Sequence, residues 1–88
     1  MITRAFSGRA GRALATAYVR AAAGDTAPKP APYPVQRGLT AVMRTTAQKS
    51  NDLDRMQAWT GQAGSLARSL PAGTLVGELW QQAQALIA

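Results

Sequence analysis

The side chains that carry out most enzyme chemistry are scarce in this chain of 88 residues, which contains no His and no Cys. A nucleophilic Ser or Thr needs an adjacent base, usually His, and zinc sites need His or Cys ligands. The one close pair of carboxylates, Asp52 and Asp54, falls where a helix is expected to begin. Acids at that position cap the helix and favour its dipole. The sequence therefore predicts no catalytic residue and no metal site within the chain.

One basic, Gly-rich segment is a candidate phosphate site. Residues 7–12 (Ser-Gly-Arg-Ala-Gly-Arg) lead into an expected helix, and the N–H groups at a helix start bind phosphate groups. The segment matches neither the dinucleotide fingerprint nor the P-loop. We therefore interpret it as a turn with solvated Arg side chains.

The net charge of +6 lies in the first half of the chain. Residues 1–50 hold eight Lys or Arg against Asp25 alone, whereas residues 51–88 hold two Arg against three acids. A strongly basic region is typical of proteins that bind nucleic acid, although the aromatic residues are not interleaved with the basic ones here. A small basic helical protein that binds nucleic acid or an anionic surface is therefore the alternative interpretation.

The chain is poor in core-forming residues. Only 15 of its 88 residues are Leu, Ile, Val or Phe, which is below the roughly 20% typical of chains with a firm core. No disulfide or zinc site is available to compensate. No apolar run approaches the ~20 residues of a membrane span, and no apolar core of a secretory signal follows Met1. We expect a cytoplasmic chain that folds only in part, or that folds against something larger.

The N-terminal part, residues 1–24, is expected to contain a short extended segment and a basic helix. Residues 1–8 end in a turn at Gly8, and a helix from Ala10 to Gly24 follows. Apolar residues recur along it at helical spacing, with Arg9, Arg12 and Arg20 on the opposite face.

A connector and a three-helix segment follow. Residues 25–34 carry four alternating Pro residues, which exclude a helix or a paired strand and predict a semi-rigid connector. Residues 35–88 show three amphipathic stripes, at 35–48, at 53–70 with a break near Gly61, and after Pro71. The fold class expected from these patterns is all-α, with about four short helices.

Four stretches resemble the C-terminal end of bacterial nitronate monooxygenases, which are flavin enzymes. Residues 3–9 (Thr-Arg-Ala-Phe-Ser-Gly-Arg) resemble the segment that follows the barrel in that family, although Ala10 replaces its usual Pro. The others are residues 32–36 (Pro-Tyr-Pro-Val-Gln), residues 56–62 (Met-Gln-Ala-Trp-Thr-Gly-Gln) and residues 66–68 (Leu-Ala-Arg) followed by Pro71. They occur in the family's order and cover nearly the whole chain.

The resemblance implies a parent enzyme that is a (β/α)8 barrel, binds FMN and oxidises alkyl nitronates with molecular oxygen. The catalytic His of that family lies upstream and has no counterpart here. This chain resembles the C-terminal helical part of such a barrel enzyme. We therefore expect a fragment that binds no FMN and is inactive alone, with a separate barrel chain as a candidate partner.

The same resemblance points to five candidate site residues. Tyr33, Gln36 and Trp59 are the candidates for a substrate pocket, since Tyr33 and Gln36 are separated by one helical turn. Gly61 and Gln62 are the candidates for contact with the cofactor, because Gly allows close backbone approach and an amide can both donate and accept. Structural packing is the alternative role for all five.

Overall fold

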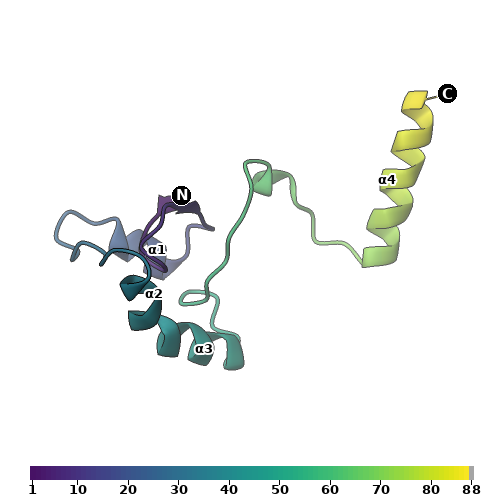
Figure 1. Cartoon of the computed structure of the whole chain (residues 1–88). Coiled ribbons are helices and arrows are strands. Elements are labelled where there is room, and N and C mark those ends of the chain that lie inside the picture. Colours follow the sequence, from purple (N-terminus) through teal and green to yellow (C-terminus); the bar gives the residue numbers. More distant parts are fainter. Residues whose placement is uncertain (88) are drawn as a thin grey trace.

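Two short strands begin the chain in the computed structural model, which describes residues 1–87. Strands β1 (Ile2–Thr3) and β2 (Gly11–Arg12) form an antiparallel hairpin in which Ile2 pairs with Arg12 and Thr3 with Gly11 (Figure 1). The ammonium group of Met1 donates a hydrogen bond of 2.7 Å to the carbonyl of Ala13 and extends this pairing. The expected all-α class is therefore wrong in one respect, because the described residues combine four α-helices with a small hairpin.

Helix α1 (Ala17–Ala22) is shorter than the helix expected from Ala10 to Gly24. The residues before it pair with distant backbone instead. The N–H of Leu14 donates to the carbonyl of Ala58 over 2.9 Å, and Ala13 forms an isolated antiparallel bridge with Trp59. These contacts satisfy backbone groups that the helix would otherwise have satisfied, so the local helical pattern is overridden.

The helix expected over residues 35–48 is present in two pieces, α2 (Val35–Leu39) and α3 (Ala41–Lys49). Thr40 separates them, and its hydroxyl donates a hydrogen bond of 2.7 Å to the carbonyl of Phe6. Residues 25–34 contain neither helix nor strand.

The prediction of a helix over residues 53–70 is wrong. Apart from a short 3-10 turn, η1 (Gly64–Leu66), these residues are irregular. Gly61 and Gly64 each lower helix stability by about 1 kcal/mol relative to Ala. The N–H of Thr60 donates to the carbonyl of Arg12 over 3.0 Å, and this contact with the hairpin requires an extended backbone at residues 58–60.

A small core holds residues 1–60 together, and we call these residues the N-terminal unit. Phe6 and Val19 are its two large buried side chains, and Tyr18 and Met43 pack against the cluster. The ring of Phe6 lies 5.0 Å from that of Tyr18 and 5.7 Å, edge to face, from that of Trp59. The core therefore joins the hairpin, α1, α3 and the segment around Trp59.

Helix α4 (Ala72–Ile87) begins directly after Pro71, as expected, and lies apart from the N-terminal unit (Figure 1). None of its residues is buried. An ion pair of 2.7 Å between Arg68 and Glu78 joins the helix to the preceding segment. Across residues 1–87, no helix combines the length and apolar character needed to cross a membrane.

Candidate functional site

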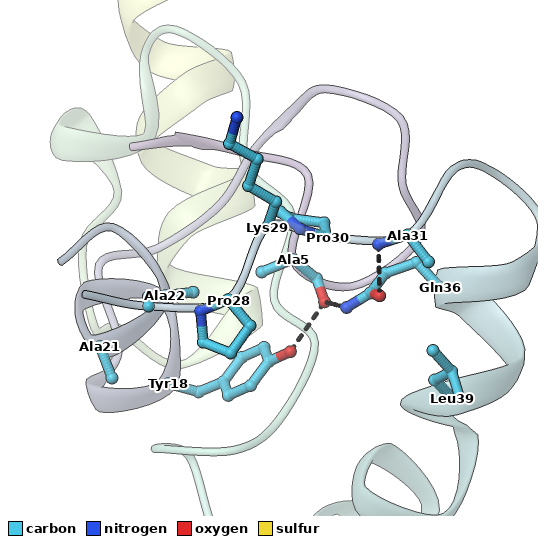
Figure 2. A pocket seen from close by; sticks show the side chains of 11 residues that line it. Ala5, Tyr18, Ala21, Ala22, Pro28, Lys29, Pro30, Ala31, Gln36 and Leu39 are labelled. Carbon is cyan, nitrogen blue, oxygen red and sulfur yellow. Dashed lines mark hydrogen bonds between the residues drawn. The ribbon is translucent and has the colours of Figure 1, made fainter. Parts of the chain in front are cut away.

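The loop between β1 and β2 contains residues 4–9 of the segment that carried the resemblance, and three side chains from elsewhere hold it in place. The hydroxyl of Tyr18 and the Nε2 of Gln36 both donate to the carbonyl of Ala5, over 2.7 and 2.8 Å (Figure 2). The hydroxyl of Thr40 donates to the next carbonyl, that of Phe6. The loop conformation is therefore set by α1, α2 and the junction between α2 and α3.

Gly8 lets the connector pass directly over this loop. Its φ of +92° lies in a region that favours glycine, and its N–H donates to the carbonyl of Arg4 over 2.9 Å. A Cβ atom at this position would collide with the backbone of Ala31, Pro32 and Tyr33. A side chain here would thus displace the connector from the loop.

The segment 7–12 does not form an open phosphate cradle. The N–H of Gly8 is bonded to Arg4, the N–H of Arg9 donates to the hydroxyl of Ser7 over 3.2 Å, and Gly11 is paired with Thr3. A phosphate site at a loop needs several N–H groups that point to one open position. Residues 7–9 form the expected turn, whereas Gly11 and Arg12 belong to β2, so the segment leads into a strand and not into the expected helix.

The arginines of this region do not line one helix face. Arg12 lies in β2, and only Arg20 lies in α1. The guanidinium of Arg9 stacks over the ring of Tyr33, 4.1 Å from its centroid, while that of Arg4 folds back onto the carbonyl of Gly8. The basic helical face that supported the nucleic-acid interpretation is therefore absent.

A pocket of about 500 Å³ lies between α1, the connector and α2. Its walls are small or rigid apolar residues, including Ala21 and Ala22 of α1 and Pro28 of the connector (Figure 2). Tyr18, Lys29 and Gln36 are the polar side chains among its lining residues. Burial raises the pKa of the Tyr18 hydroxyl above its usual 10.0, and the hydrogen bond with the Gln36 side chain partly opposes this change.

The structure separates two of the five predicted site residues. Gln36 lines the pocket, but both ends of its amide are bound within the chain, because Oε1 accepts a hydrogen bond of 3.0 Å from the N–H of Ala31 and Nε2 donates to Ala5. Tyr33 is exposed, precedes α2 and is not among the residues that line this pocket. Tyr33 and Gln36 therefore do not share this pocket, and their roles toward substrate stay predictions.

The other three predicted site residues lie in or just after the extended segment at residues 58–60. The ring of Trp59 packs edge-on against Phe6 and lies so close to Gly11 that a Cβ there would meet it. Trp59 is nevertheless 45% exposed, and Gly61 and Gln62 are exposed. Their roles toward substrate and cofactor stay predictions.

Tyr18 and Thr40 organise the loop but were not predicted as site residues. The sequence pattern placed Tyr18 on an apolar helix face. Because buried Tyr hydroxyls usually find an acceptor, this position could have indicated a hydrogen bond to a distant backbone group. Thr40 lies within a helical pattern and gives no signal of its own. Over residues 1–87, no group of three or more His, Cys, Asp or Glu side chains comes together to hold a metal ion.

Comparison with known proteins identifies one family. The sequence profile described as "Nitronate monooxygenase" matches residues 1–82. The chain is 36% identical over 77 residues to the nitronate monooxygenase of Paraburkholderia phytofirmans, an alignment that covers 88% of this chain and 21% of that protein. It is 30% identical over 82 residues to a "Probable nitronate monooxygenase" of Staphylococcus aureus, covering 93% of this chain and 23% of that protein.

The chain thus spans between a fifth and a quarter of the length of these curated relatives. No solved structure matches it. The profile match includes all four stretches that carried the resemblance, from the loop at residues 3–9 to the segment before α4. The chain belongs to the nitronate monooxygenase family.

Proposed function

We propose that this chain is the C-terminal helical part of an FMN-dependent nitronate monooxygenase, and that it has no oxidase activity by itself. The support is the family match over residues 1–82, together with the small share of the relatives that the chain covers. The chemistry of the chain supports it too, because a sequence without His lacks the side chain that most often acts as a general base, and one without Cys lacks the thiolate nucleophile.

The observation that carries this proposal is the imbalance between buried and exposed apolar residues. Within residues 1–87, Phe6 and Val19 are the only large side chains that are fully buried. Sixteen large apolar residues are exposed, including Leu39 and Val42 of α2 and α3 and Leu53 after them. Soluble monomers rarely expose contiguous apolar patches beyond a few hundred Å². A larger body, which we take to be the barrel, would cover this surface.

The residues of this chain do not fit the phosphate of FMN. The N–H groups of Gly8 and Arg9 are bonded within the loop, so segment 7–12 offers no cradle. In our proposal the barrel supplies the groups that bind FMN, and this chain contributes side chains at the edge of the barrel. Tyr33, Trp59, Gly61 and Gln62 are exposed and are the proposed contacts, whereas Gln36 holds the loop.

The experiment joins the chain to a barrel. The nitronate monooxygenase of Paraburkholderia phytofirmans, deleted for its matching segment, is fused to the complete 88-residue chain. We expect the fusion to retain flavin through gel filtration and to consume oxygen with propyl-2-nitronate. The deleted relative and the chain alone should do neither. Flavin absorbance or oxygen uptake by the isolated chain would refute the proposed inactivity.

A double variant tests whether the apolar surface of α4 takes part in that docking. Leu79 and Trp80 are 56% and 61% exposed, so replacing both with Ser leaves the N-terminal unit intact. We expect the Leu79→Ser/Trp80→Ser fusion to lose flavin, because covering side chains of this size contributes several kcal/mol. Equal flavin retention by the two fusions, or none by either, would show that this docking proposal is wrong.

A further inference from the structure

Helix α4 carries a heptad pattern on the apolar face that the proposed function places against the barrel, and in the chain without a barrel this face is open to another partner. Val76, Leu79, Ala83 and Leu86 occupy the a and d positions of two successive heptads, and Trp80 and Ile87 flank them at the e positions. A seam of this kind is typical of helices that pair side by side with another helix. No residue of α4 is buried, so the seam has no partner within residues 1–87.

The exposure and charge of this seam favour a second copy of the same helix as its partner. Val76 is 66% exposed and Leu86 is 87% exposed. Glu78 is the single charged residue of α4, and it lies at the outward c position, where it forms the ion pair with Arg68. Two copies of α4 can therefore meet along the seam without bringing like charges together.

Side-chain volume favours an antiparallel arrangement of the two helices. In a parallel pair, Ala83 would face Ala83 of the partner subunit and leave a void in the seam, which is destabilising. In an antiparallel pair, a positions face d positions. Val76 then meets the partner's Leu86, and Leu79 meets the partner's Ala83, so each layer combines a smaller with a larger residue. Opposed helix dipoles also favour this direction.

We propose that the isolated chain forms an antiparallel homodimer through α4, with its two-fold axis near Gln81. The proposal is independent of the proposed function, because it concerns the chain without a barrel. A helix of 16 residues is about 24 Å long. We expect two helices of this length to bury less than the roughly 1,200 Å² of a standard stable interface. The dimer should therefore be weak and dissociate on dilution.

Sedimentation equilibrium over a range of concentrations tests the dimer. We expect the mass of the wild-type chain to rise from 9.2 kDa towards twice that value with increasing concentration. Leu79→Lys places a charge in the seam and should keep the chain monomeric. Gln84→Lys adds the same charge at an outward b position and should dimerise like the wild type. A monomeric wild type, or a Leu79→Lys variant that dimerises equally, would overturn the proposal.

Cross-linking tests the direction of the two helices, and the absence of native Cys makes single substitutions informative. Gln82 lies next to the proposed axis, so Gln82→Cys should be joined by a short bismaleimide. The two copies of Ala72 would be about 27 Å apart at 1.5 Å per residue. Ala72→Cys should therefore not be joined. Cross-linking of Ala72→Cys but not of Gln82→Cys would indicate a parallel pair and refute the antiparallel arrangement.

Discussion

Phe6 and Trp80 are both large aromatic residues, yet Phe6 is 1% exposed and Trp80 is 61% exposed. Phe6 lies in a loop whose shape depends on Tyr18, Gln36 and Thr40, all distant in the sequence. Trp80 lies in a helix that is held mainly by its own backbone hydrogen bonds. The N-terminal unit therefore depends on long-range contacts, whereas α4 depends on local ones and leaves its apolar face exposed.

Among the variants that distinguish the two regions, Phe6→Ala is expected to change the stability of the N-terminal unit most. Removing a buried Phe costs about 3–5 kcal/mol, which is a large part of the stability of a small domain. We expect the N-terminal unit to unfold while α4 keeps its helicity. In a Trp80→Phe background, near-ultraviolet circular dichroism and Trp59 fluorescence report on the first region, and the residual helical signal reports on the second.

Leu14→Ala is the matched control, because Leu14 is in the same unit but is 50% exposed. It should leave the tertiary signal largely unchanged. If Phe6→Ala keeps the tertiary signal, or abolishes the helicity of α4 as well, the proposed independence of the two regions is wrong.

Gly8→Ala is expected to have the next largest effect. The left-handed φ costs about 1–2 kcal/mol for a residue with a Cβ, and the collision with the connector adds about 1–3 kcal/mol. Gly38→Ala is its control, since a Cβ at Gly38 in α2 meets nothing within 4 Å and should stabilise the helix by up to about 1 kcal/mol. In a Trp80→Phe background, the urea midpoint measured by Trp59 fluorescence should fall for Gly8→Ala and rise for Gly38→Ala.

Thr40→Val tests the hydrogen bond to the carbonyl of Phe6 with little change in side-chain volume. We expect a loss of about 1–3 kcal/mol, because a buried acceptor is left without its donor. Thr45→Val in the exposed part of α3 is the comparison and should change the urea midpoint far less. Equal midpoints for the two variants would mean that the hydroxyl of Thr40 does not hold the loop.

The smallest expected change in the stability of the N-terminal unit is the one caused by alkaline pH. Burial raises the pKa of Tyr18 above its unfolded value of 10.0, so the folded state keeps this proton when the unfolded state has lost it. The stabilisation is fully present below pH 10.0 and is lost as the pH rises through the folded pKa. In thermal unfolding across this range, Tyr18→Phe should show a shallower loss of stability than the wild type. An identical pH dependence would argue against this role of Tyr18.

Local sequence patterns were sufficient for several features. The last helix was predicted because Pro71 suits its first turn and an intact apolar stripe follows, and both signals act within a few residues of each other. The same holds for the helical residues 35–48, for the absence of His and Cys, and for the short stretches that identify the family. None of these depends on which distant segments come together.

Other features were decided by the tertiary structure. The hairpin, the shortened α1 and the irregular segment 53–70 arise together, because the backbone of Arg12 pairs with Thr60 and that of Leu14 with Ala58. Each pairing replaces hydrogen bonds that a helix would have made. The position of the Gln36 side chain has the same cause, because its amide donates to the carbonyl of Ala5 and accepts from the N–H of Ala31. Periodicity reports only neighbours three or four residues away, so it cannot register contacts between segments that are far apart in the chain.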